Sequence, residues 1–341
     1  MAEYRRDEAR EWAKATMRGV CGCMLPTLNS SLTAINERAI RHDVRREQEL
    51  GFWGTLLVSE CGTTQDEMRQ VIDVGVDEAR SVGLRTVLLA SFPTLNDTIE
   101  MVRYAEQAGV DLVLLSYPLL FHPRSEDDVY EYTRAVADRT SLGMILFCVA
   151  QWNFGRLHPS EFSPSLIGRL IDDVPNIVAV KNEIGAPGVA GIAEVFYRFK
   201  DKVVVSDPFE QNAPAWVTTF GMPFMGTSNY EYMGGEVPRY FNLLQQGQFD
   251  EAMAIYWRLH PARQANAQVA AGYIGGTGLV HRMVWKYQYW LNGFNGGPIR
   301  QPAPRINDNQ MRALRQGLVR SGLTPTPDDD QEFFTGRNPL E

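Results

Sequence analysis

A regular alternation of short apolar runs with longer stretches of helical periodicity constrains the fold of this chain more than any other feature. The apolar runs are rich in Val, Ile and Leu, as expected of parallel strands that are buried on both faces. Eight such runs occur before the pattern stops. We predict strands at residues 20–25, 54–58, 85–89, 111–115, 143–147, 177–181, 202–206 and 223–227.

Helical periodicity fills the intervals between these strands. Thr94, Ser125 and Ser163 stand where helix N-caps are expected, and Pro164 suits a first helical position. No Gly-x-Gly-x-x-Gly fingerprint follows the first strand, and no second sheet is indicated. The pattern therefore favours a (β/α)8 TIM barrel over an open doubly wound sheet. Predicted helices occupy residues 36–50, 65–82, 94–108, 125–139, 164–172, 190–199 and 210–220.

After residue 227 the pattern changes to helices alone, which predicts a C-terminal helical extension of the barrel. Its helices are expected at 236–246, 250–269, 278–290 and 308–321. We divide the chain into an N-terminal extension (1–17), the barrel (18–235), the C-terminal helices (236–323) and a tail (324–341). The tail mixes prolines with the acidic run Asp328–Asp330, so we expect it to lie on the surface, partly ordered.

The composition excludes several classes of function. The chain has 341 residues, a formal net charge of −8 and a pI near 5.3, which argues against a nucleic-acid partner. No signal peptide and no run of about 18 apolar residues is present, so we expect a cytoplasmic protein without membrane contact. Four scattered cysteines and five histidines without ligand spacing predict neither disulfides nor a metal site.

Lys181 is the outstanding candidate for catalysis. The chain has only five lysines, and Lys181 alone ends an apolar run, where its amine would project into the barrel mouth. Partial desolvation there favours the neutral amine, which can attack a carbonyl group. The alternative reading is a structural lysine that pairs with a carboxylate such as Glu183.

The residues around Lys181 resemble a known family. Ile177–Lys181 is similar to the strand-six lysine motif of the dihydrodipicolinate synthase and N-acetylneuraminate lyase family, which comprises class I aldolases and lyases. Val203–Asp207 resembles the family's strand-seven segment, and Met225–Asn229 its strand-eight segment. Gly247–Ala252 resembles the start of a C-terminal helix. The resemblance covers residues 18–269.

The resemblance implies a mechanism and a set of site residues. Lys181 would form an imine with a pyruvate-type 2-oxo acid, without a metal or other cofactor. The strand-two loop, with Ser59, Cys61, Gly62 and Thr63, would hold the substrate carboxylate, and Ser228 and Asn229 would close the site. The family also implies a homodimer or homotetramer, and the apolar helices within 267–290 could bury a subunit interface.

Two departures from the family pattern bear on the chemistry. Phe147 stands where the family has the strand-five tyrosine that shuttles protons, and Leu119 and Leu120 replace an aromatic pair after strand four. A phenyl ring cannot transfer a proton, so another group must do so. Glu60 is our first choice, because a carboxyl group in an apolar mouth can serve as general acid and base; Tyr117 and an ordered water are the alternatives.

Aromatic residues near the predicted mouth, including Tyr117, Phe147 and Trp152, suggest a more apolar substrate than a sugar acid. Glu60-Cys61-Gly62-Thr63 resembles the Glu-Cys-Ala-Thr element of hydratase-aldolases that cleave aromatic ylidene-pyruvates. We therefore predict a Schiff-base aldolase or lyase with an apolar or aromatic substrate. A dehydratase or decarboxylase on the same imine scaffold, and a non-catalytic ligand-binding barrel, are the alternatives.

Overall fold

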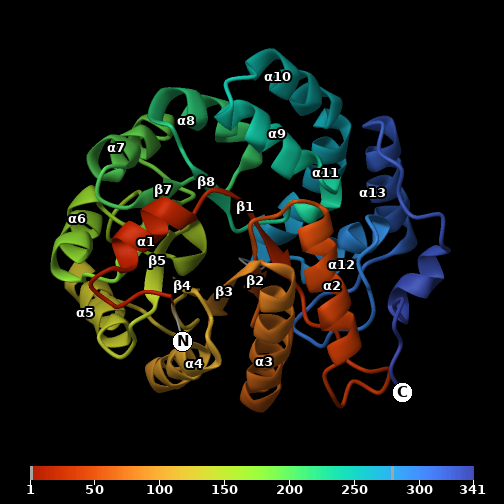
Figure 1. Ribbon diagram of the computed structural model, residues 1–341, viewed down its shortest axis with the longest axis horizontal. Coiled ribbons are helices and arrows are strands. Elements are labelled where there is room, and N and C mark those ends of the chain that lie inside the picture. The colour runs from red at the N-terminus through yellow and green to blue at the C-terminus, as the bar shows by residue number, and fades with distance from the viewer. Residues whose placement is uncertain (1–2, 278–279) are drawn as a thin grey trace. The chain divides into compact units, whose positions relative to one another are not determined.

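The computed structural model describes residues 3–277 and 280–341. Eight parallel strands form one sheet in the order β7-β6-β5-β4-β3-β2-β1-β8 (Figure 1). This order confirms the predicted (β/α)8 barrel with its C-terminal helices. The strands are β1 (Gly19–Met24), β2 (Gly54–Leu57), β3 (Arg85–Ala90), β4 (Leu112–Leu115), β5 (Gly143–Cys148), β6 (Ile177–Asn182), β7 (Val204–Ser206) and β8 (Phe224–Gly226).

Seven helices follow the predicted strand–helix alternation, and their ends carry the expected signals. Thr94 and Ser163 accept hydrogen bonds from backbone N–H groups three residues on, as N-caps do. Ser125 stands at the N-cap of its helix but makes no side-chain cap bond. The helices are α2 (Glu37–Glu49), α3 (Gln65–Val82), α4 (Leu95–Ala108), α5 (Glu126–Ala137), α6 (Pro164–Asp173), α7 (Val189–Phe199) and α8 (Ala213–Phe220).

Two compact units make up the chain. The first contains the residues up to Cys21 together with Arg85–Thr227, and the second contains Gly22–Leu84 and Ser228–Glu341. In the first unit, α4 to α8 lie outside the strands β3 to β8 (Figure 1). Every residue of β5 and β6 is buried, because these strands face the barrel interior on one side and helices on the other.

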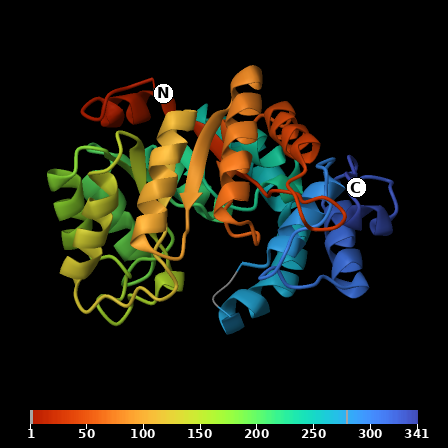
Figure 2. The same ribbon diagram turned by 90° about the horizontal axis from the view of Figure 1, so that it is seen from below.

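The N-terminal extension contains a helix that the sequence pattern did not indicate. Helix α1 (Ala9–Thr16) lies at one end of the first unit, and the loops that leave β4 and β5 lie at the opposite end (Figure 2). Arg10 donates hydrogen bonds to the carbonyls of Val174 at 2.7 Å and Ile177 at 2.8 Å. The hydroxyl of Tyr4 accepts from the N–H of Gly143 at 2.7 Å. The segment thus satisfies polar backbone groups at the amino ends of β5 and β6.

The second unit contains β2, α2 and α3 with the C-terminal helices. The predicted helix 250–269 is two helices, α10 and α11, because Pro261 cannot continue the hydrogen bonding of the first. The predicted start of the next helix at residue 278 lies outside the described residues. The helices are α9 (Glu236–Gln245), α10 (Phe249–Arg258), α11 (His260–Thr277), α12 (Arg282–Leu291) and α13 (Asp308–Arg320).

The tail packs more closely than the sequence suggested. Phe333, in the short 3-10 helix Asp330–Phe334, is fully buried against the rings of Tyr287 and Trp290. Asp328 and Asp330, from the acidic run, form ion pairs with Arg337 and Arg315. The tail therefore contributes its own hydrophobic contact and charge pairs to the second unit.

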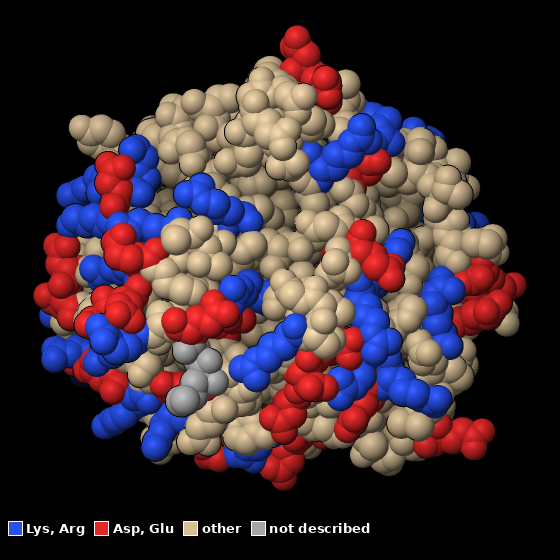
Figure 3. Space-filling model, in the orientation of Figure 1, with Lys and Arg blue, Asp and Glu red and all other residues tan. Residues whose placement is uncertain are grey.

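Acidic and basic side chains are interspersed over the molecular face in Figure 3. Such mixing is typical of proteins that do not bind nucleic acid, which usually requires a basic surface. In the described part of the chain, the helices lack the combination of length and apolar character that a membrane span requires.

Candidate active site

Lys181 lies near the carboxyl end of β6 and is almost completely buried, with 4% of its surface exposed. The preceding Ile177–Val180 supply the apolar strand that carries it inward. Parallel pairing places Lys181 opposite Phe147 of β5 and opposite Ser206 of β7. The lysine is thus held on both sides by neighbouring strands of the barrel.

Among the described residues, two groups contact the Lys181 amine. Its Nζ lies 2.8 Å from Oε1 of Glu183 and 3.7 Å from the centroid of the Phe147 ring. Both contacts stabilise a cation that is largely removed from water, the first by ion pairing and the second by the ring quadrupole. The Phe147 ring therefore presents a π face to the amine but has no exchangeable proton.

Trp152 and Tyr117 complete an aromatic wall beside Phe147. The indole Nε1 of Trp152 donates to the backbone carbonyl of Phe147 at 2.7 Å, and the two rings meet edge to face. Tyr117 packs against Trp152, and its hydroxyl lies 2.6 Å from Oγ1 of Thr133. Burial raises the pKa of the Tyr117 hydroxyl, which disfavours release of its proton.

Two further ionisable side chains near Lys181, Asp207 and Cys148, are poorly suited to react. Asp207 follows β7 and accepts hydrogen bonds from Nδ2 of Asn212 at 2.8 Å and Nε1 of Trp216 at 2.7 Å. Burial raises the pKa of Asp207, although these bonds oppose the shift. Burial also raises the pKa of the Cys148 thiol, so this cysteine is not a ready nucleophile.

The strand-two loop belongs to the second unit. Glu60 forms an ion pair with Arg282 of α12, whose side chain is 92% buried. Oγ1 of Thr63 donates to the carbonyl of Ser59 at 3.3 Å, which closes the loop on itself. Cys61 is buried, and burial raises the pKa of its thiol to about 11. The loop is a compact turn whose one acidic side chain is already paired.

Other parts of the second unit hold this loop and the segment after β8. Gly62 adopts a positive φ of 74°, and its carbonyl accepts from Nη1 of Arg300 at 3.1 Å. The carbonyl of Ser228 accepts from the backbone N–H of Tyr230 at 3.1 Å. Nδ2 of Asn229 donates to Gln288 at 2.9 Å, while its buried Oδ1 has no hydrogen-bond partner within the described residues.

The sequence-predicted site residues therefore fall into two groups. Lys181, Phe147, Trp152 and Tyr117 gather in the first unit, and the second unit contains Glu60 with its loop, Ser228 and Asn229. The sequence analysis named Glu183 as a structural partner of Lys181, and the structure confirms that the two side chains pair. It did not identify Arg282 as a partner of Glu60, because the two residues lie 222 positions apart.

A second buried lysine differs from Lys181 in its bonding. Lys286 of α12 donates to the carbonyls of Leu25 and Pro26 and to Oγ1 of Thr27, at 3.1, 3.2 and 2.6 Å. These three bonds use all of its ammonium protons. Burial lowers the pKa of Lys286 to about 8, but its role in this arrangement is to hold the segment after β1.

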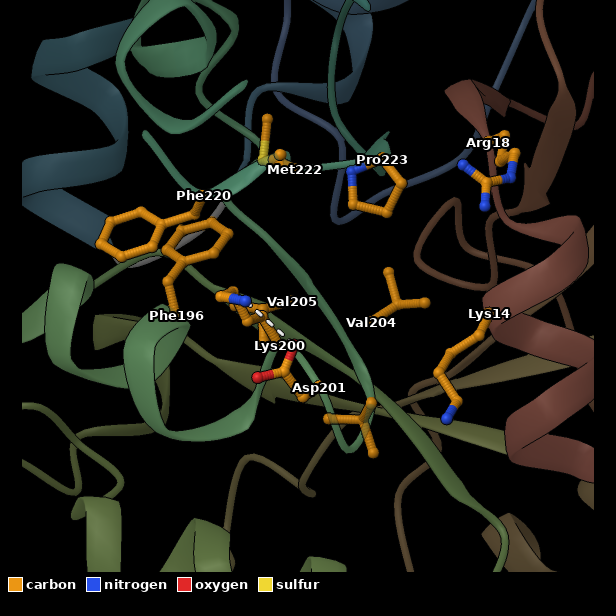
Figure 4. Close-up of a pocket in the computed structure, with 12 residues that line it drawn as sticks. Lys14, Arg18, Phe196, Lys200, Asp201, Val204, Val205, Phe220, Met222 and Pro223 are labelled. Carbon is orange, nitrogen blue, oxygen red and sulfur yellow. Dashed lines mark hydrogen bonds and ion pairs between the residues drawn. The ribbon is translucent and has the colours of Figure 1, made fainter. Parts of the chain in front are cut away.

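A hollow of about 290 Å³ in the first unit lies away from Lys181. It is bordered by the residues that precede β1, β7 and β8, among them Arg18, Asp201 and Pro223 (Figure 4). These residues mark the amino ends of the strands, whereas Lys181 is near a carboxyl end. Among residues 3–277 and 280–341, no cluster of three or more His, Cys, Asp or Glu could hold a metal ion.

Comparison with known proteins identifies the family. A sequence model of the Dihydrodipicolinate synthetase family matches residues 61–291, well over half of the chain. The chain belongs to the dihydrodipicolinate synthetase family. Members of this family are class I aldolases and lyases, so this member is an enzyme of the lyase class. The predicted family resemblance is thereby confirmed.

The similarity to individual members is distant. The chain is 24% identical over 305 residues to the 4-hydroxy-tetrahydrodipicolinate synthase of Methanothrix thermoacetophila, which covers 85% of this chain and 93% of the relative. It is 23% identical to an uncharacterized DapA-like lyase of Pyrobaculum arsenaticum, over 85% of this chain and 94% of the relative. At these identities the chain is a distant member of the family.

Solved structures share the fold. N-acetylneuraminate lyase from Fusobacterium nucleatum matches with a TM-score of 0.73 and 18% identity, covering 89% of this chain and 98% of the other. Dihydrodipicolinate synthase from Aquifex aeolicus matches with a TM-score of 0.74 and 18% identity, covering 91% and 99%. This family member therefore has the barrel and helical extension of its relatives.

Proposed function

We propose that the protein is a Schiff-base aldolase or lyase that forms an imine between Lys181 and a pyruvate-type 2-oxo acid. The observation that carries the proposal is the buried amine at the end of β6, held between Glu183 and the Phe147 ring. A protonated imine withdraws electrons from the adjacent carbon, so C–C bonds can be made or broken there. The imine is itself the electron sink, so the proposal requires no metal or other cofactor.

Borohydride trapping tests this proposal directly. Incubation with pyruvate and borohydride is expected to give a stable reduced adduct on Lys181, located by mass spectrometry of peptides. The variant Lys181→Ala should form no adduct. Lys200→Ala is the matched control, because Lys200 is an exposed lysine paired with Asp201, and it should be trapped as the wild type is. Absence of an adduct on Lys181 at saturating pyruvate would contradict the proposal.

Phe147 and Trp152 favour a substrate whose non-pyruvate portion is apolar or aromatic. The Phe147 ring contacts the Lys181 amine, and the Trp152 ring packs against Phe147. The one polar group of these two rings, the indole N–H of Trp152, is bonded to the backbone carbonyl of Phe147. A hydratase-aldolase acting on an aromatic ylidene-pyruvate fits such a wall. Turnover of an aromatic aldehyde with pyruvate, compared with that of a polyhydroxylated aldehyde, distinguishes this substrate class from a sugar acid.

A second candidate function follows from the missing strand-five tyrosine. A dehydratase or decarboxylase on the same imine would need different proton transfers from an aldol cleavage. Product analysis separates them, since dehydration gives no aldehyde fragment and decarboxylation gives carbon dioxide.

The homodimer or homotetramer that the family implies stays a prediction, which light scattering of the purified protein would test.

A further inference from the structure

Glu183 contacts the Lys181 amine from the residue that follows β6. Glu183 directly follows β6, two residues after Lys181, and the ion pair between them shows that both side chains lie on the same side. The backbone N–H of Glu183 donates to the carbonyl of Cys148 at 2.9 Å, which continues the β5–β6 pairing beyond Asn182. The carboxylate is thereby fixed in register with the lysine.

Exposure differs between the two partners in a way that suits this role. The Lys181 side chain is 5% exposed, whereas that of Glu183 is 17% exposed. The carboxyl group can therefore exchange protons with solvent while its Oε1 contacts the amine at 2.8 Å. General acid–base catalysis requires a carrier within hydrogen-bond reach of the reacting atom, and this distance meets that condition.

Other groups in the first unit are poorly suited to the task. The Phe147 ring contacts the amine but has no exchangeable proton. The Tyr117 hydroxyl is bonded to Thr133, and both oxygens of Asp207 accept hydrogen bonds. Cys148 is a fully buried thiol whose pKa is raised by burial and by the charge of Glu183. Within the part of this unit that the structure describes, Glu183 is the ionisable group that contacts Lys181.

We propose that Glu183 is the catalytic residue that carries protons during imine formation on Lys181, in place of the strand-five tyrosine. The assignment rests on the proposed Schiff-base function. It differs from the sequence-based choice of Glu60, which is paired with Arg282 in the second unit. In this proposal the carboxylate of Glu183 transfers the protons that the strand-five tyrosine transfers in the rest of the family.

The proton balance closes with one carboxylate. Glu183 first takes a proton from the Lys181 ammonium. The free amine then attacks C2 of the substrate, and the π electrons of the C=O bond move to the carbonyl oxygen. The carboxylic acid protonates that oxygen, and its carboxylate then removes a proton from the new ammonium to give a neutral carbinolamine. Finally Glu183 protonates the departing hydroxyl, water leaves, and the nitrogen lone pair forms the protonated imine. The carboxylate is regenerated.

The variant Glu183→Gln tests this assignment, because it keeps the shape of the side chain and removes the proton carrier. Single-turnover trapping with pyruvate and borohydride on the full-length protein is expected to slow by roughly 10²- to 10⁴-fold. The pH–rate profile should also lose one of its limbs, which a purely structural role would not cause. Glu183→Asp keeps a carboxylate and should retain more of the rate than Glu183→Gln.

Three controls make the outcome decisive. Glu194→Gln removes an exposed carboxylate of α7 that pairs with Arg198, and should be trapped at the wild-type rate. Glu183→Ala should regain rate in proportion to added formate, which supplies a small carboxylate. Circular dichroism shows whether each variant is folded.

The possible results separate the two proposals. Trapping of Glu183→Gln at the wild-type rate, or a comparable loss only in Glu60→Gln, would overturn the role of Glu183 while leaving Lys181 as the nucleophile. The role of Glu183 would also be overturned if Glu183→Asp and Glu183→Gln lost the same amount of trapping rate and formate did not restore the rate of Glu183→Ala. A wild-type protein that forms no adduct on Lys181 would overturn the Schiff-base function itself.

Discussion

Gly22 of β1 has no side chain, and this leaves room for the buried carboxyl groups of Glu47 and Glu231 beside the strand. A Cβ at this position of β1 would fall inside contact distance of Oε1 of Glu231, and 3.3 Å from Oε1 of Glu47. Both carboxyl groups are completely buried. Glu231 is held by the backbone N–H groups of Cys23 and Tyr230. The glycine therefore provides the space in which these acids meet.

Replacing Gly22 by alanine should destabilise the protein by about 1–3 kcal/mol, because the added methyl group forces the Glu231 carboxylate to move. Urea denaturation measures the change. The control Gly168→Ala lies in α6, where an added Cβ would meet Phe199 at 3.5 Å, an ordinary contact. It should be neutral or mildly stabilising, because alanine favours helix. Equal effects of both substitutions would contradict the argument.

At this scale the sequence predicted that Lys181 ends a buried strand, but not which group contacts its amine as a proton carrier. Lys181 could be found because a charge that ends an apolar strand is unusual. Glu183 was considered only as a structural partner, since a sequence does not tell whether an ion pair is static or transfers protons. Arg282 was not found at all, because no local pattern links a residue of α12 to the loop after β2.

At the scale of elements, the helix that precedes the Lys181 strand has a well-formed start. Oγ of Ser163 accepts from the N–H of Leu166 at 3.0 Å, and Pro164 occupies the first turn of α6. The cap fixes where α6 begins. Ser125 occupies the same position in α5 without such a bond.

These two serines allow a matched experiment. Ser163→Ala should lower the free energy of unfolding by about 1 kcal/mol, because one backbone N–H at the helix start loses its acceptor. Ser125→Ala should cost much less, since no cap bond is lost. Chemical denaturation of the two variants provides the comparison, and a larger loss for Ser125→Ala would refute the assignment of the caps.

Element boundaries were predictable where the local signals were strong. The eight strands and the capped helices between them follow from periodicity and N-cap residues, and the structure confirms them. The break between α10 and α11 was missed although Pro261 marks it, because the apolar pattern runs through the proline. Helix α1 was missed because its buried face consists of two alanines, Ala9 and Ala13, which give only a weak apolar periodicity among the charged residues.

For the whole molecule, the buried acid pair links stability to pH. Burial raises the pKa of Glu231 to about 7, and burial together with the charge of Glu231 raises that of Glu47 well above its usual value. Unfolded glutamates ionise near pH 4.5. The folded state therefore binds more protons above that pH, so stability is fully present below about 4.5 and declines as pH rises through about 7.

The variant Glu47→Gln should remove much of this decline, because it removes the carboxyl group whose pKa burial and the charge of Glu231 raise well above its usual value. We expect a gain on the order of 1–3 kcal/mol at pH 8 relative to pH 5, measured by urea denaturation at both pH values. Glu49→Gln, on the exposed side of the same helix, should leave the pH dependence unchanged. A parallel decline in wild type and Glu47→Gln would contradict the role of the pair.

The contacts of the N-terminal segment have a consequence for the order of events during synthesis. Arg10 binds carbonyls that lie 164 and 167 positions later in the chain, and Tyr4 binds a backbone group 139 positions later. The ribosome therefore releases this segment long before its binding sites exist. Arg10 must therefore remain without these two acceptors through the synthesis of five strands, so its docking is expected among the later steps of folding.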